Sequence, residues 1–113
     1  MLSALALMLT LSSAPPSVRS LGDLRFGVQV AQKGLWKEAL FRFEKAVRST
    51  PDDPKALNNL AVALEQAGEF GRARQTYERA LELAPGNLHI QQNYDLFREA
   101  DDKRHRSQKQ RER

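Results

Sequence analysis

The apolar residues of this chain recur at every third or fourth position, which is the spacing of amphipathic helices. Two such stripes follow one another closely in the middle of the chain, and each predicts one short helix. The first stripe consists of Leu57, Leu60, Ala61, Leu64 and Ala67, and the second of Phe70, Ala73, Tyr77, Ala80 and Leu81. Helices joined so closely can only pack as antiparallel neighbours, so the sequence predicts a helical hairpin.

Residues typical of helix ends flank both stripes. Asp53 precedes Pro54, a pair that favours a helix start, because the Asp side chain accepts from free amide groups and Pro fits the first turn. Gly68 stands between the stripes, and Pro85 followed by Gly86 ends the second one. These signals place one hairpin over residues 54–87.

The same hairpin is written a second time, 34 residues upstream. Identical residues at this offset are Gly34 and Gly68, Ala39 and Ala73, Glu44 and Glu78, Ala46 and Ala80, and Pro51 and Pro85. Similar residues at the same offset are Phe26 and Leu60, Val30 and Leu64, Trp36 and Phe70, Phe43 and Tyr77, and Val47 and Leu81. The sequence therefore predicts two copies of one structural unit.

This period, with its glycine, alanine, aromatic and proline positions in fixed order, resembles the tetratricopeptide repeat, whose length is about 34 residues. The resemblance implies an all-α, right-handed α-solenoid with one hairpin over residues 20–53 and another over 54–87. Gly27 and Ala61 stand where that family has a small residue. Asp23 departs from the family, which has a large apolar residue there, so the opening turn is expected to be loose or differently packed. An ordinary helical bundle with coincidental spacing is the alternative.

Residues 88–102 begin as the first helix of a third unit and then depart from the pattern. Asp95 and Arg98 stand where the earlier copies have small or apolar residues, so no following helix can pack on them. We therefore expect a capping helix over residues 88–102, which closes the C-terminal end of the array. Residues 103–113 contain nothing that can be buried and are predicted to be frayed or disordered.

Residues 1–19 precede the repeats. Residues 2–11 are nearly all apolar, but ten residues span only about 15 Å as a helix, half of a hydrocarbon core. A secretory signal peptide fits this length best, although its charged start is missing; an uncleaved interfacial anchor and a plain apolar extension stay open. We expect an exported (periplasmic or secreted) or membrane-associated protein, with a cytoplasmic one as the alternative. Residues 14–19 are predicted as a Pro/Ser linker, and Ser20 with Asp23 as a capping box that starts the first helix.

Composition changes this picture in two places. The absence of cysteine excludes disulfides, thiolate metal sites and a cysteine nucleophile. The net charge of +4 comes from residues 103–113, where six basic residues face one acidic residue, so the rest of the chain carries −1. His89 and His105 are not at the spacing of metal ligands, and the chain has no glycine-rich phosphate loop. We therefore expect no enzyme, no metal and no cofactor.

The resemblance implies that the first helices of successive units contact a protein or peptide in a concave groove. The expected contact residues lie beside the buried stripes of those helices: Arg25, Val28, Lys55, Asn58, Asn59, Val62, Gln66, His89 and Asn93. Asn59 and Asn93 share one register, and an amide can both donate to and accept from a peptide backbone. Ligand contact and a hydrogen bond between helices are both open for these asparagines.

The sequence thus predicts a protein–protein interaction module or adaptor that binds a peptide or a partner helix. The alternative is a binder of acidic surfaces, nucleic acid or anionic membrane, through the basic tail. That tail has no aromatic residue for base stacking, which disfavours nucleic acid, whereas the apolar N-terminal segment favours membrane contact. Since about three repeats are normally needed for stability, we expect support from self-association or from a partner protein, with contact at the open end near Leu21, Leu24 and Val28.

Overall fold

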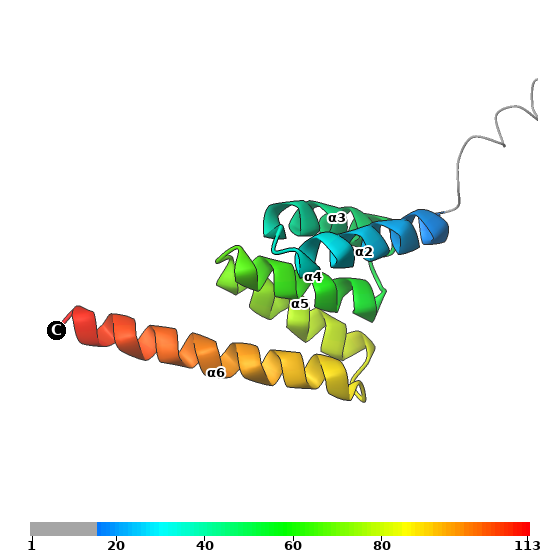
Figure 1. Ribbon diagram of the computed structural model, residues 1–113. Helices are drawn as coiled ribbons and strands as arrows, with labels where there is room; N and C mark the ends of the chain where they lie inside the picture. Colours follow the sequence, from blue (N-terminus) through cyan, green and yellow to red (C-terminus); the bar gives the residue numbers. More distant parts are fainter. Residues whose placement is uncertain (1–15) are drawn as a thin grey trace, which may run out of the picture.

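A computed structural model describes residues 16–113, and within them it contains five α-helices and no strand. The helices are α2 (Pro16–Gln32), α3 (Trp36–Ser49), α4 (Pro54–Gln66), α5 (Phe70–Leu83) and α6 (Leu88–Arg111). Figure 1 shows α2 to α5 stacked in chain order as two antiparallel hairpins, with the long α6 beside α5. The all-α prediction is confirmed. The predicted apolar segment at 2–11 lies outside the described residues. Among the helices that are described, none combines the length and apolarity needed to cross a bilayer.

The two hairpin turns are built alike because each has a glycine in the left-handed region. Gly34 has φ 77° and Gly68 has φ 79°, a conformation that other L residues adopt only with strain. In both turns the residue after the glycine donates a backbone hydrogen bond of 2.9 Å to the carbonyl five residues earlier, from Leu35 to Val30 and from Glu69 to Leu64. The 34-residue period therefore fixes both reversals of the chain.

Small residues let the helices within and between the hairpins approach closely. Four alanines of α3 and α5 have no exposed surface: Ala39, Ala46, Ala73 and Ala80. On α2, Gly27 lies against the ring of the buried Phe43, and a Cβ there would overlap that ring. The core is continuous across both hairpins, because Leu64 and Tyr77 of the second pack in one cluster with Phe43 of the first.

The first helix begins earlier than predicted. It starts at Pro16, so residues 16–19 belong to α2 and not to a linker. Proline fits the first turn of a helix because the amide it lacks has no partner there. Ser20 is buried and donates to the carbonyl of Ala46 at 3.2 Å, so it joins α2 to α3 and does not cap a helix.

The opening turn of the first unit is packed differently from that of the second, which was one of the two predicted outcomes, and it is not loose. Asp23 is only 8% exposed, and its carboxylate accepts a hydrogen bond from Arg42 at 3.5 Å. The ion pair occupies the place that a large apolar residue has in the second unit. Leu24, predicted at the open end, is buried with 6% exposure, whereas Leu21 and Val28 are exposed.

Fraying or disorder after residue 102 was predicted, but α6 continues as a helix to Arg111. Asp102 stands in the register of the two turn glycines, and without a glycine at this position the left-handed turn is less favoured than continued helix. An ion pair of 3.2 Å between Lys103 and Glu99 supports the continued helix. The basic residues are therefore arranged on a helical rod.

Candidate functional site

A hollow of about 280 Å³ opens on the face formed by α2, α4 and α6. All three are first helices in the repeat pattern, and two residues of α3, Trp36 and Phe43, complete the wall. The lining residues are Val28, Ala31, Gln32, Trp36, Phe43, Asn58, Asn59, Val62, His89 and Asn93.

Six of the nine residues predicted for a groove line this hollow: Val28, Asn58, Asn59, Val62, His89 and Asn93. Val28 and Val62 lie 34 residues apart, so the period brings equivalent positions of successive helices to one wall. The other three predicted residues, Arg25, Lys55 and Gln66, are exposed and do not line it.

Four lining residues did not follow from the sequence pattern. Ala31 and Gln32 lie on the turn of α2 that follows Val28, so a longer stripe on that helix would have included them. Trp36 and Phe43 belong to α3, a second helix, which the family resemblance places away from the groove. The Phe43 ring lies against Gly27. The small size of this glycine is the feature of the sequence that could have indicated where the Phe43 ring lies.

Of the two roles left open for the asparagines, Asn93 has the hydrogen bond between helices. Nδ2 of Asn93 donates a hydrogen bond of 3.1 Å to Oδ1 of Asn58, which is 4% exposed. The bond ties α6 to α4 and orients two amides of the wall. Asn59 makes no hydrogen bond with its side chain within residues 16–113, so its amide stays available.

The hollow has an uncharged lining. Among the described residues that form its wall there is no Asp, Glu, Lys or Arg. Aliphatic and aromatic side chains share the wall with three asparagines, a glutamine and a histidine. Such a wall can bury an apolar side chain and hydrogen-bond a peptide backbone beside it. In residues 16–113 no cluster of three His, Cys, Asp or Glu side chains is placed to hold a metal ion.

The far wall of this site depends on how α6 is held to α5. The rings of Tyr77, Tyr94 and Phe97 lie 5.5 to 6.3 Å apart in one aromatic cluster between the two helices. Tyr77 also donates a hydrogen bond of 2.9 Å to Glu65, and burial, with this bond, raises the pKa of its hydroxyl. The cluster places His89 and Asn93 on the side of α6 that faces the hollow.

A buried carboxylate completes the attachment of α6. Asp101 is 4% exposed and accepts hydrogen bonds from Arg74 at 2.8 Å and from Arg104 at 3.0 Å. The Arg104 guanidinium lies 3.6 Å from the centre of the Phe70 ring. Burial by itself raises the pKa of Asp101, and the two arginine hydrogen bonds outweigh it, so this pKa lies below its usual range.

Comparisons with known proteins agree with this architecture. The tetratricopeptide repeat model matches residues 28–87. The C-terminal TPR-containing domain of a Plasmodium falciparum FK506-binding protein has the same fold, with a TM-score of 0.74 and 21% identity over 80% of this chain and 60% of that one. The mouse protein O-mannosyl-transferase TMTC1 is 32% identical over 92 residues, which are 81% of this chain but 10% of that protein. The family model covers more than half of the chain, and its stacked hairpins are a general scaffold for protein–protein interaction. This chain belongs to the tetratricopeptide repeat family.

Proposed function

We propose that the hollow face binds a peptide segment or a helix of a partner protein, so that the chain acts as an adaptor. One observation carries the proposal: three successive first helices contribute to one uncharged hollow of about 280 Å³. Two of its lining residues, Val28 and Val62, repeat at the period of the units. A ligand that follows this period would meet the same chemistry on neighbouring helices.

The wall offers both kinds of contact that a peptide needs. Val28, Val62 and Trp36 provide apolar surface for one side chain of the ligand. Asn59 provides an amide with free donors and acceptors for the ligand backbone. The link between Asn58 and Asn93 holds the wall in place before the ligand arrives, which lowers the entropic cost of binding.

The role we propose is non-catalytic. Among the described residues, the lining of the hollow holds no carboxylate, lysine, cysteine or serine that would act as a base or a nucleophile. His89 is exposed, and the described residues of the wall give it no partner carboxylate.

This proposal can be tested with peptides that bind the full chain. Such peptides are first selected from a random phage-displayed library. We expect Val62→Arg to weaken binding of the selected peptides by roughly thirtyfold in fluorescence anisotropy, since a central apolar contact is replaced by a bulky charge. Leu96→Arg is the matched control. Leu96 holds the same register one unit later, is 67% exposed, and does not line the hollow.

A second pair of variants protects the test against misfolding of Val62→Arg. Asn59→Ala and Gln32→Ala remove polar groups from the wall without adding volume, and circular dichroism confirms that each variant is folded. Loss of affinity in these variants with retention in Leu96→Arg supports binding in the hollow. Peptides that bind all the variants equally well would overturn the proposal.

A further inference from the structure

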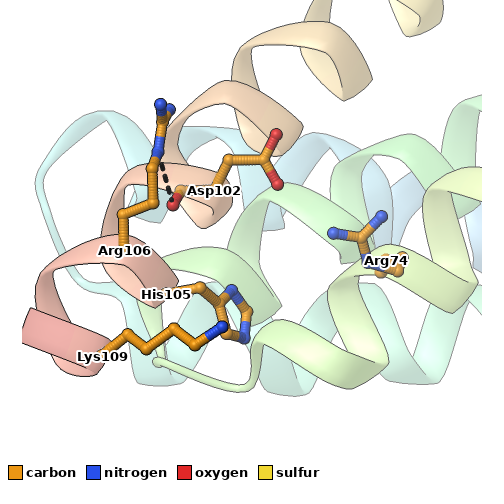
Figure 2. A pocket seen from close by; sticks show the side chains of 5 residues that line it. All are labelled: Arg74, Asp102, His105, Arg106 and Lys109. Carbon is orange, nitrogen blue, oxygen red and sulfur yellow. Dashed lines mark hydrogen bonds between the residues drawn. The ribbon is translucent and has the colours of Figure 1, made fainter. Parts of the chain in front are cut away.

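The last turns of α6 present a row of charged side chains on one side. Asp102, Arg106, Lys109 and Arg113 follow at intervals of four, three and four residues, the spacing that keeps side chains on one face of a helix. Arg113 continues the register just past the end of α6. All four residues are exposed. Figure 2 shows the first three along α6, with Arg74 of α5 across the adjoining cleft.

The charges of this outer row are not neutralised within residues 16–113. Lys109 and Arg113 make no ion pair there, and the Asp102 carboxylate has none either. Arg106 donates from Nε to the backbone carbonyl of Asp102 at 3.3 Å and contacts no carboxylate. By contrast, the neighbouring Arg104 is held by the buried Asp101. The outer row is therefore free to pair with groups outside the described chain.

The residue composition of the last helical turns of α6 favours some negatively charged partners over others. Residues 105–113 contain no apolar side chain, so the helix has nothing to insert into a bilayer interface. They contain no Phe, Tyr or Trp on which a base would stack. Asp102 stands in the same row as the three cations and would repel a uniformly negative polymer such as a nucleic acid. A helix of another protein can carry both signs and match each position.

We propose that the outer row docks a helix of a partner protein that places a basic residue opposite Asp102 and carboxylates opposite Arg106, Lys109 and Arg113. The surface is separate from the hollow, because His89 and Asn93 lie on the other side of α6. Exposed ion pairs add modest affinity, so this contact mainly selects the partner and its register. It stands whether or not the hollow binds a peptide.

Two synthetic helical peptides test the proposal with the full chain. The matched peptide carries Lys opposite Asp102 and Glu opposite the three cations, and the all-acidic peptide carries Glu at all four positions. We expect the matched peptide to bind more tightly in fluorescence anisotropy, with affinity that falls as NaCl is added. Arg106→Glu with Lys109→Glu should weaken it by roughly tenfold. Lys37→Glu with Lys45→Glu changes the net charge equally on exposed positions of α3 and should leave the affinity unchanged.

Reversal of the charge at Asp102 provides a sharper test. Asp102→Lys should reverse the preference, so that the all-acidic peptide binds more tightly than the matched one. Duplex DNA and phosphatidylserine vesicles are measured beside the peptides. An unchanged preference in Asp102→Lys, tighter binding of DNA or vesicles than of the matched peptide, or no binding of either peptide would each overturn the proposal.

Discussion

Gly27 is the residue at which the backbone of α2 approaches an aromatic side chain most closely. A Cβ at this position would overlap the ring of Phe43, which is only 3% exposed. We expect Gly27→Ala to lower the free energy of unfolding by about 1–3 kcal/mol through overpacking. Urea unfolding monitored by circular dichroism measures this change.

Gly22 on the same helix is the control for that substitution. A Cβ there would meet nothing within 4 Å, so Gly22→Ala should raise the free energy of unfolding, by up to about 1 kcal/mol, through its better helix propensity. If both substitutions stabilise the protein, the Phe43 ring can turn away and the close approach is not required for the fold.

The sequence predicts those wall residues of the hollow that lie beside a helix stripe. It does not predict those whose position depends on the shape of a neighbouring residue. Val28 and Val62 are predicted for the groove because they lie beside the buried stripes of their helices, and both line the hollow. Phe43 reaches the wall only beside Gly27, which has no side chain. The bond between Asn58 and Asn93 depends on how α6 lies across α4, which no spacing along the chain reveals.

At the scale of the helices, α6 is held at its middle by an ionic contact that titrates. The pKa of Asp101 is lower in the folded protein than in the unfolded chain, so the contact stabilises the fold fully above about pH 4 and is lost as pH falls through the folded value. We expect Asp101→Asn to cost roughly 1–3 kcal/mol at neutral pH, because two arginines lose a charged partner. Urea unfolding at a series of pH values should show this difference shrinking toward acid pH.

Asp102→Asn is the control for the helix contact. Asp102 is exposed and its carboxylate has no ion-pair partner within residues 16–113, so its substitution should change the free energy of unfolding by less than about 0.5 kcal/mol. Equal losses in the two variants would show that general charge balance, and not the buried contact, stabilises α6.

The sequence predicts the order of the helices correctly, but it does not predict the length of α6. Gly34 and Gly68 mark both turns in the sequence, and the structure has a turn at each. The polar composition after residue 102 predicted fraying, since it offers no buried stripe. A helix with local ion pairs needs no such stripe, and the contact of Arg104 with Phe70 lies between helices far apart in sequence.

At the scale of the whole molecule, exposed apolar surface is concentrated on the first hairpin. Among the described residues, six of the eight large exposed apolar side chains belong to residues 18–41, and none belongs to the second hairpin. The six are Val18, Leu21, Phe26, Val28, Leu35 and Phe41. Exposed apolar side chains concentrated on one hairpin are typical of a contact with another protein, and these six are called the patch below.

We expect the chain to self-associate through this first hairpin. Light scattering coupled to size exclusion should give a mass above that of the monomer at micromolar concentration. Leu21→Arg should shift the mass toward the monomer, because it places a charge within the patch. Leu88→Arg, at a residue that is 76% exposed outside the patch, should leave the mass unchanged. A stable monomer of the unaltered chain would contradict this expectation.

Because α6 continues past Asp102, it sets the distance between the hollow and the C-terminal end of the helix. Arg111 lies 18 positions after Asn93 on one continuous helix, and 18 helical steps span about 27 Å from the wall of the hollow. A ligand tethered to the tip of this rod cannot reach the hollow of the same molecule unless its linker has about eight extended residues. Shorter tethers can deliver their cargo only to a neighbouring molecule, so linker length would decide between intramolecular and intermolecular capture.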